Sequence, residues 1–480
     1  TSDYGVSVLL DEYIVNVLPE GGQKSRVSYL YEIVSEKGIE ELKEYSIDYS
    51  NSVLKSEIIK EDGKLVPAEK GDGILVFPNL KVGDIICVQY ENFNNDTGRF
   101  YKDFNVSNNF NSSYPSKESV FMLIAPTNLK YNLALTNGDL APTTKTVGTK
   151  TIKTWKKSNV TALPLLESYA PNYSDLTNKL QIATIKSWSE ISNWYADLVK
   201  KSMKVDKITQ DTFAQIFPQG SKGLSQDEIA LKIYTYIESN INYSSLDFRQ
   251  SGHIPQKPSK TITTKLGDCK DVSTLFVALA NMANLPANLV LVLTNDNAAS
   301  ALNLPSINFN HCIVKTQIDG KEYFIELTDK YLPFKALPIT LYQAKALVIS
   351  FDKESNEKSK LISIPFDNAI KNINKTSTTV TITESGKTFN NKHFIQGAKK
   401  SHYNEMFSDA TTEDIRKKEF EGFYNGQLSK VITLQSIKNV TKSLFDPQLI
   451  YESTFTTPDV LKKVGNIRIV DIPFIDKAYS

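Results

Sequence analysis

Cysteine, histidine and acidic residues follow one another in this sequence in an order that suggests nucleophilic thiol chemistry. Cys269 lies in the pentapeptide GDCKD, directly before a stretch with helical periodicity. A helix N-terminus offers free N–H groups and the positive end of the helix dipole, and both favour thiolate, the nucleophilic form of a thiol. His311 follows at the start of an expected strand, where a neutral imidazole can take the thiol proton. The backbone N–H of Cys269 is also placed to donate to an oxyanion.

Glu326 is the third candidate residue of this site. If Asp319-Gly320 forms the centre of an even-length hairpin loop, the strand register places His311 opposite Thr328. Glu326 is then the diagonal neighbour of His311 on the same face, whereas Asp329 points to the other face unless a bulge intervenes. In this arrangement Glu326 orients the imidazole and stabilises its protonated form, the third role in a catalytic triad.

Each of these residues also has a purely structural interpretation, which the sequence leaves open. Free cysteine is among the most buried residue types, so Cys269 could simply close a helix. A single histidine on a strand is usually structural, and a strand glutamate such as Glu326 is usually solvated. Asp268 and Asp271 are expected to be structural, with Asp271 capping the first helical turn.

The other candidate groups carry weaker signals. Gln256 and Tyr243 are further candidates for an oxyanion donor. Cys312 is expected on the opposite face of its strand, in the core, and Cys87 is expected to be an inert core thiol because it lies in an apolar run. The sequence has no zinc-ligand spacing, EF-hand run or phosphate-binding glycine loop, so neither a metal nor a cofactor is expected.

The helices and strands that the sequence predicts around these side chains form an α+β core over residues 185–350. Capping-box patterns at 187–190 and 225–228 predict two helix starts. Apolar residues over 272–282 recur with the 3.6-residue period of a buried helix. A strand is expected at 289–294, and a hairpin at 311–317 and 321–328.

Sequence typical of β structure flanks this core on both sides. Residues 1–165 alternate polar and apolar positions, with turn signals such as Asp62-Gly63, and predict a β-sandwich-like domain. Residues 159–183 lack periodicity and are expected to form an irregular linker. Over residues 360–480 strand patterns return at 360–364, 378–382, 431–435 and 466–472, with one helix at 412–423. The prediction is a multi-domain α+β protein with an N-terminal β domain, a central core and a C-terminal, mainly β domain.

Composition sets further bounds on the 480-residue chain. A net charge of +1 gives no electrostatic reason to expect nucleic acid or an anionic membrane as a partner. Three cysteines do not form a disulfide framework, and no apolar stretch is long enough to span a membrane. The chain begins at Thr1 and ends in strand-like sequence at 475–478, so both ends look trimmed. The sequence therefore leaves open that a signal peptide has been removed. The sequence says nothing of oligomeric state.

Together these motifs resemble the core of the bacterial transglutaminase-like superfamily, which has a papain-like fold. The resemblance covers residues 185–350 and rests on GDCKD before an apolar helix, on the run ending at His311, and on the segment 326–334. The acid comes fifteen residues after the histidine, as in that family. Weaker similarities, at 81–86 and in the helix of Trp188 and Trp194, extend to a subgroup in which β domains enclose the core.

The resemblance implies a cysteine enzyme that acts on amide or peptide bonds through a Cys–His–acid triad and a thioester acyl-enzyme, with hydrolysis expected more than cross-linking. It also implies a periplasmic, cell-surface or secreted protein with a protein, peptide or cell-wall substrate. The sequence departs from the family at Glu326, where aspartate is usual. The alternative is therefore a catalytically weak or inactive protein that serves as a protein- or glycan-binding scaffold.

Overall fold

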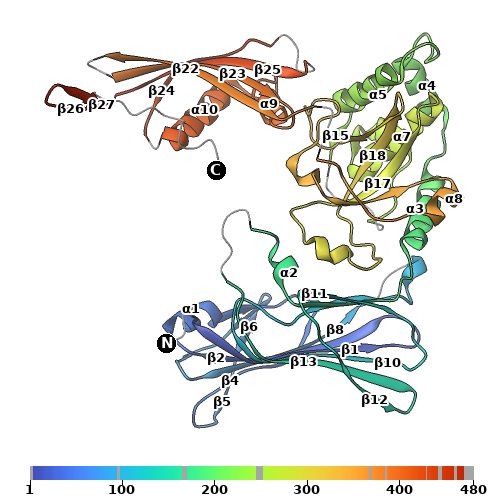
Figure 1. Cartoon of the computed structure of the whole chain (residues 1–480), viewed down its shortest axis with the longest axis vertical. Coiled ribbons are helices and arrows are strands. Elements are labelled where there is room, and N and C mark those ends of the chain that lie inside the picture. The colour runs from blue at the N-terminus through green and yellow to red at the C-terminus, as the bar shows by residue number, and fades with distance from the viewer. Residues whose placement is uncertain are drawn as a thin grey trace. The chain divides into compact units, whose positions relative to one another are not determined.

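Two units make up the fold, Thr1–Trp194 with Asp296–Asn308, and Tyr195–Asn295 with Phe309–Ser480 (Figure 1). The computed structural model describes residues 4–94, 98–164, 170–244, 252–366, 370–383, 386–428, 430–441, 446–458 and 462–469. In this described part of the chain, no helix is long and apolar enough to cross a membrane.

Unit 1 is built on a sheet of eight strands in the order β12-β13-β10-β1-β2-β8-β4-β5. β1 runs parallel to β10 and antiparallel to β2. The strands of this sheet are β1 (Val6–Val17), β2 (Gln23–Ile33), β4 (Ser52–Ile59), β5 (Leu65–Pro67), β8 (Ile85–Asn94), β10 (Ser116–Pro126), β12 (Thr143–Val147) and β13 (Lys150–Val160). The turn predicted at Asp62-Gly63 joins β4 and β5, which pair as a hairpin.

Two three-stranded sheets complete unit 1. They are β3 (Glu44–Ser46), β7 (Ile74–Val76) and β6 (Glu69–Gly71), and β11 (Asn132–Thr136), β14 (Lys179–Ala183) and β9 (Asn105–Asn109). One apolar cluster joins Val6 of the large sheet to Leu75 of the first small sheet. A second cluster joins Val15 of the large sheet to Ile182 of the other small sheet. Unit 1 is therefore a sandwich with two separate cores, and the β-sandwich-like prediction is confirmed.

The expectation of an irregular linker at 159–183 is wrong in two places. Residues 173–176 form the short helix α2 (Tyr173–Leu176), and β14 is the middle strand of its sheet, with all five of its residues buried. A strand that is covered on both faces loses the polar–apolar alternation by which strands are usually recognised, which explains the error. Residues 165–169 of the expected linker lie outside the described residues.

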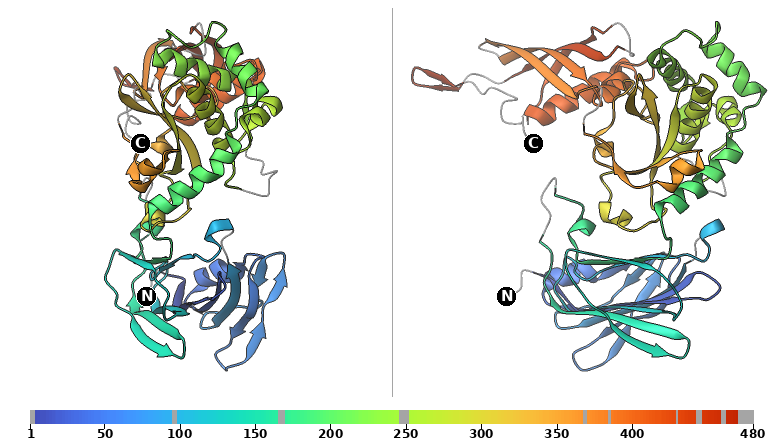
Figure 2. Two further views of the ribbon diagram at one scale, coloured as in Figure 1. Left: turned by 90° about the vertical axis from the view of Figure 1, so that its right-hand side faces the viewer. Right: turned by 45° about the vertical axis from the view of Figure 1, so that its right-hand side comes forward.

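Unit 2 contains the α+β core, which has an antiparallel sheet in the order β19-β18-β17-β20-β21. Its strands are β17 (Ala287–Leu293), β18 (His311–Ile318), β19 (Lys321–Ile325), β20 (Lys345–Ile349) and β21 (Ile362–Ser363). Its helices are α3 (Trp188–Ser202, which begins in unit 1), α4 (Lys207–Ile216), α5 (Gln226–Asn240), α6 (Pro258–Thr264), α7 (Cys269–Met282) and α8 (Lys353–Glu357). Figure 2 shows the green and yellow-green helices gathered against one side of this sheet.

Most local predictions for this core agree with the structure, but the strand expected over 321–328 ends at Ile325, so Thr328 does not pair with His311 across the hairpin. Ser225 and Glu228 form the predicted capping box at the start of α5. Helix α7 begins at Cys269, and every residue from Lys270 to Ala280 is buried, as the apolar period predicted. The hairpin register is confirmed over its paired region, from Ile318 opposite Lys321 to Val314 opposite Ile325.

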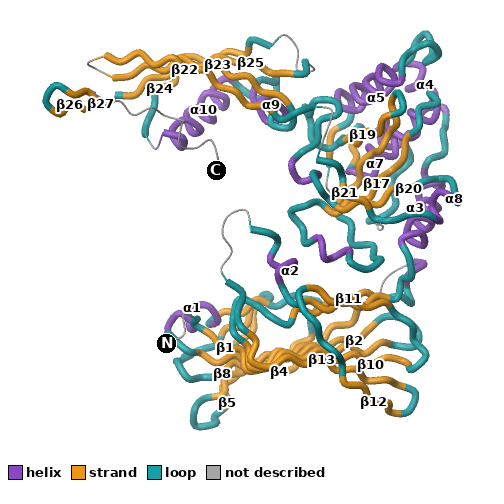
Figure 3. The backbone as a smooth tube through the Cα atoms, in the orientation of Figure 1, coloured by secondary structure: helices purple, strands orange, loops and turns teal. Residues whose placement is uncertain are grey.

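The C-terminal part of unit 2 is a four-stranded sheet, β22 (Ile373–Thr383), β23 (Gly386–Gln396), β25 (Gln448–Thr457) and β24 (Thr433–Asn439), in that order. Two helices, α9 (Lys400–Met406) and α10 (Glu413–Leu428), pack on it around an apolar cluster with Tyr451 at its centre (Figure 3). The predicted helix at 412–423 corresponds to α10, whereas α9 was not predicted.

Two C-terminal expectations need correction. The strand expected at 360–364 belongs to the central sheet, because β21 pairs with β20. Of the strand expected at 466–472, residues 467–469 form β27 (Ile467–Ile469), which pairs with β26 (Lys462–Val464). Residues 470–472 and the strand-like segment 475–478 lie outside the described residues.

Candidate active site

Cys269 is the first residue of α7, held there by two aspartates that cap the helix reciprocally. The Asp268 carboxylate accepts the backbone N–H of Asp271 at 3.2 Å, and the Asp271 carboxylate accepts the backbone N–H of Asp268 at 3.1 Å. The first N–H groups of a helix have no acceptor within the helix, so the thiol of Cys269 lies where such donors are concentrated. The capping role predicted for Asp271 is confirmed, and Asp268 shares it.

The charges of these two aspartates are engaged by other partners. Asp268 forms an ion pair with Lys270, which is itself buried. Asp271 also accepts the backbone N–H of Gln256 at 2.8 Å. The side chain of Gln256 donates to the carbonyl of Leu266 at 2.9 Å, which gives this suggested oxyanion donor a structural partner.

His311 is the first residue of β18 and pairs with Val292 of β17. Its Nε2 lies 2.7 Å from Oε2 of Glu326, and the side chain of Cys269 lies near enough to the ring to raise its pKa. Since Nε2 faces the carboxylate, Nδ1 is the ring nitrogen left for the sulfur. Burial alone lowers the pKa of His311, but the charge of Glu326 and the nearby Cys269 outweigh it and raise that pKa to about 10. The imidazole is therefore held in its protonated form.

Glu326 lies directly after β19 and is 2% exposed. Its Oε1 accepts three hydrogen bonds, from the backbone N–H of Leu327 at 2.8 Å and from the N–H and Oγ1 of Thr328 at 2.6 and 2.7 Å. Burial raises the pKa of Glu326, but the charge of His311 and the bonds from His311 and Thr328 lower it further than burial raises it. The carboxylate therefore stays ionised and forms a charged pair with His311.

The structure thus brings Cys269, His311 and Glu326 together. The carboxylate of Asp329 has a different partner: it accepts the hydroxyl of Ser401 at 3.2 Å. Tyr243 borders the site, since the charges of Cys269 and Glu326 act with burial to raise its pKa.

The other two cysteines differ from Cys269 in their surroundings. Cys312 is 3% exposed, as expected for a core residue, and burial raises the pKa of its thiol. Cys87 is half-buried, so the expectation that it is a core thiol is wrong: its side chain lies at the partly open face of β8. Burial also raises the pKa of Cys87. Among the described residues, no group of His, Cys, Asp or Glu could hold a metal ion.

Sequence reasoning missed two supporting residues. Thr328 was considered only as the partner of His311 across the hairpin, yet it donates twice to Glu326. Asp268 was not identified as the helix cap, although an acid three residues before another acid at a helix start is a variant of the capping-box pattern. The capping signal was therefore present in the sequence, whereas the role of Thr328 depends on how the chain bends after β19.

Two known families match parts of the chain. Residues 212–325 match the transglutaminase-like superfamily, a range that includes Cys269 and His311 and ends one residue before Glu326. Residues 72–164 match a domain of unknown function, DUF3857. The chain therefore carries a transglutaminase-like domain behind a DUF3857 domain. No curated protein matches the sequence.

One solved structure gives the same class of fold. A candidate protease from Parabacteroides distasonis is 13% identical and has a TM-score of 0.56, over 95% of this chain and 94% of that one. A candidate cysteine protease from Cytophaga hutchinsonii is 14% identical over 55% of this chain and 84% of that one, with a TM-score of 0.20. At such identity the first similarity establishes the fold alone: a multi-domain, strand-rich α+β protein with a transglutaminase-like core.

Proposed function

We propose that the protein is a cysteine enzyme that cleaves amide or peptide bonds with Cys269 as nucleophile, His311 as general base and acid, and Glu326 as the residue that orients His311. The contact of 2.7 Å between Nε2 of His311 and Oε2 of Glu326, on a ring whose pKa the neighbouring Cys269 also raises, is the observation that carries this proposal. A protonated imidazole beside a thiol stabilises the thiolate, which is the attacking species.

In the first half of the proposed reaction, the thiolate of Cys269 attacks the amide carbonyl carbon. A C–S bond forms and the carbonyl electron pair moves onto oxygen, where the backbone N–H of Cys269 is placed to donate to it. As the tetrahedral intermediate collapses, the C–N bond breaks and His311 gives its proton to the leaving amine. The product of this half is a thioester on Cys269 and a neutral His311.

In the second half, neutral His311 takes a proton from water while the water oxygen attacks the thioester carbon. The C–S bond breaks, the carboxylic acid leaves, and the thiolate–imidazolium pair returns. An amine in place of water would give a new amide and thus cross-linking. Hydrolysis is favoured in this proposal because the solved structure from Parabacteroides distasonis is described as a candidate protease.

The proposed substrate is a protein or peptide, including the peptide part of a cell wall, met in the periplasm or at the cell surface. The resemblance to proteins with flanking β domains supports this location. The second candidate function is a scaffold without catalysis, and the observation that favours it is glutamate at position 326 in place of the family's aspartate.

Thiol reactivity separates the two functions. At about pH 6 an ordinary thiol is almost fully protonated, so iodoacetamide is expected to label Cys269 well before Cys87 and Cys312. His311→Ala is expected to abolish this selectivity, whereas Asp329→Ala should keep it. Equal and slow labelling of all three cysteines would exclude the enzymatic proposal. Incubating peptide amides with and without an alkylamine, followed by mass spectrometry, then distinguishes hydrolysis from transfer.

A further inference from the structure

The large sheet of unit 1 has a polar interval between its two apolar cores. On β1 the inward-facing residues Val6 and Val8 belong to one core, and Val15 and Val17 belong to the other. Between them Asp11 and Tyr13 line a pocket of about 470 Å³. Inward positions of a sandwich strand normally carry apolar residues, because burying a polar group costs free energy unless it finds a partner.

The neighbouring strands β2 and β8 show the same change from apolar to polar inward residues at the same level of the sheet. On β2, Ser25 and Tyr29 line the pocket, whereas Ile33 further along the strand is in the core. On β8, Tyr90 and Asn92 line it, whereas other residues of that strand are in the core. Three adjacent strands thus place asparagine and serine at inward positions, beside tyrosines whose rings pack against the two cores.

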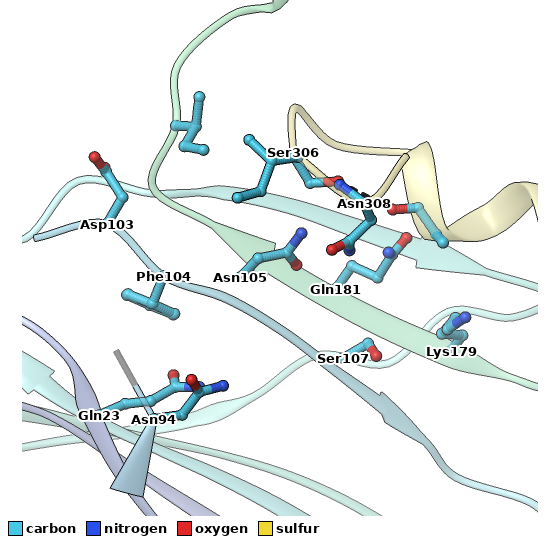
Figure 4. Close-up of a pocket in the computed structure, with 13 residues that line it drawn as sticks. Gln23, Asn94, Asp103, Phe104, Asn105, Ser107, Lys179, Gln181, Ser306 and Asn308 are labelled. Atoms are coloured by element: carbon cyan, nitrogen blue, oxygen red, sulfur yellow. Dashed lines mark hydrogen bonds between the residues drawn. The ribbon is translucent and has the colours of Figure 1, made fainter. Parts of the chain in front are cut away.

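A second pocket, of about 210 Å³, adjoins the first and shares Gln23, Asn94 and Ser107 with it. It lies between the sheet β11-β14-β9 and residues 301–308, which belong to unit 1 and follow the short helix η2 (Ala299–Leu302). Figure 4 shows the side-chain amides of Gln181 and Asn308 close together in this pocket. This second wall is also rich in amides and hydroxyls.

Several polar atoms in these walls are buried and have no hydrogen-bond partner among the described residues. They are Oε1 of Gln23, Oε1 of Gln181, Nδ2 of Asn105 and Nδ2 of Asn108. Gln23, Gln181 and Asn108 are 6%, 2% and 8% exposed. Buried polar groups in native proteins are nearly always paired, so this cluster along two adjoining pockets calls for partners from outside the chain, which ordered water or a ligand supplies.

The charged side chains in the walls already have partners. Of the described residues that line the larger pocket, Asp11 alone is charged, and it accepts the hydroxyl of Ser119 at 3.3 Å. In the smaller pocket Lys179 donates to Ser174 and Ser300, at 2.7 and 3.0 Å. Asp103 there accepts the hydroxyl of Thr184 at 2.8 Å. The groups that remain for a ligand are neutral amides and hydroxyls.

We propose that these adjoining pockets bind a neutral oligosaccharide. A sugar hydroxyl both donates and accepts, which matches amide side chains that offer an acceptor oxygen and a donor nitrogen side by side. The rings of Tyr13, Tyr29 and Tyr90 add apolar faces with a polar tip, suited to the C–H faces of sugar rings. A phosphorylated ligand would instead require unpaired arginine or lysine, and a peptide would require apolar anchor pockets.

This proposal depends on unit 1 alone and is independent of the thiol chemistry. Titration calorimetry on the full chain with tetrasaccharides of N-acetylglucosamine, β-1,4-glucose, α-1,4-glucose and xylose is expected to find at least one that binds with a Kd of about 1 mM or tighter. Cys269→Ala should bind that sugar equally well. A failure of the proposed enzymatic function would therefore leave this binding unchanged.

Two variants test the site itself. Gln23→Leu and Gln181→Leu each remove an unpaired buried acceptor, so neither should lower the Tm of the free protein. Each is expected to weaken sugar binding roughly tenfold, because a buried hydrogen bond to the ligand is lost. Gln89→Leu is the matched control, since Gln89 lies on β8 but faces the other side and donates to Ser28.

The outcomes decide the proposal. Binding that weakens in Gln23→Leu and Gln181→Leu, with an unchanged Tm and an unchanged Gln89→Leu control, supports it. No binding of any of the four sugars at about 1 mM would overturn it. Binding that persists in both leucine variants would also overturn it, because the sugar would then occupy another surface.

Discussion

One carboxylate oxygen of Glu326 contacts His311, and the other accepts hydrogen bonds from the two residues that follow Glu326 in the chain. Oε2 lies 2.7 Å from Nε2 of His311, while Oε1 accepts the N–H groups of Leu327 and Thr328. The side chain thus bends back over the residues that follow it and still reaches the imidazole. Both contacts are made through a side chain one methylene longer than that of aspartate.

Shortening or neutralising this acid should therefore reduce reactivity. Glu326→Asp is expected to slow alkylation and turnover about tenfold to a hundredfold, because the shorter side chain cannot keep both contacts. Glu326→Gln keeps the length but loses the charge that holds the imidazolium, and should cost about a hundredfold or more. Both are measured as the rate of Cys269 alkylation at about pH 6. A faster Glu326→Asp variant would mean that the natural glutamate is a less effective form of the family acid.

Thr328 is expected to act as a positioning residue for Glu326. Thr328→Val removes the hydroxyl that donates at 2.7 Å but keeps the backbone N–H bond and the shape of the side chain. The loss of one hydrogen bond to a charged group is worth about 1.5–3 kcal/mol, so turnover should fall about tenfold to a hundredfold. It should also move the alkaline limit of activity to lower pH, which a purely structural role would not do. Asp329→Asn, on the next residue, is the matched control and should leave that limit unchanged.

The pH dependence of activity should follow His311. The proposed mechanism needs its proton for the leaving amine, and Glu326 and Cys269 raise its pKa to about 10. Activity should therefore persist through neutral pH and decline as pH rises through about 10. Because the folded-state pKa is raised, the pairing also stabilises the fold below the ordinary pKa of histidine, and this contribution is lost on approach to pH 10. Rates measured over this range in Glu326→Gln should decline at lower pH; an unchanged profile would assign the limit to another group.

His393 predicts a loss of stability in acid. It is 6% exposed, stacks on Tyr451 at 4.2 Å between ring centroids, and bonds Thr376 and Tyr424. Burial lowers the pKa of His393 to about 4. Between the ordinary pKa of histidine and about pH 4, His393 is therefore protonated in the unfolded chain but neutral in the folded chain. Unfolding free energy should fall by about 3 kcal/mol as pH drops from about 6.5 to about 4.

Urea unfolding of His393→Gln, followed by circular dichroism, should show a weaker dependence on pH over this range than the wild type. His402→Gln is the control, because His402 lies in the same domain with an exposed side chain. If both variants keep the full dependence on pH, another group causes it.

Much of the candidate site follows from rules that act over a few residues. A helix start at Cys269 follows from a capping acid and an apolar period, and the hairpin register follows from the turn at Asp319-Gly320. The errors concern segments whose place is decided by tertiary packing. β14 was taken for a linker because it is covered on both faces, and β21 was assigned to the wrong sheet because its described strand partner, β20, belongs to the central sheet.

The sequence by itself determined the order of thiol, imidazole and acid, and the local structure that carries each, because caps, periodicity and turns depend on residues within one or two turns of chain. Only the tertiary structure decided that the three meet. The approach of Cys269 to His311 requires α7 to pack on β18, and the bend of Glu326 requires Thr328 to turn back after β19. The pockets of unit 1 depend in the same way on sheets that converge from distant segments, so no local pattern in the sequence could identify them.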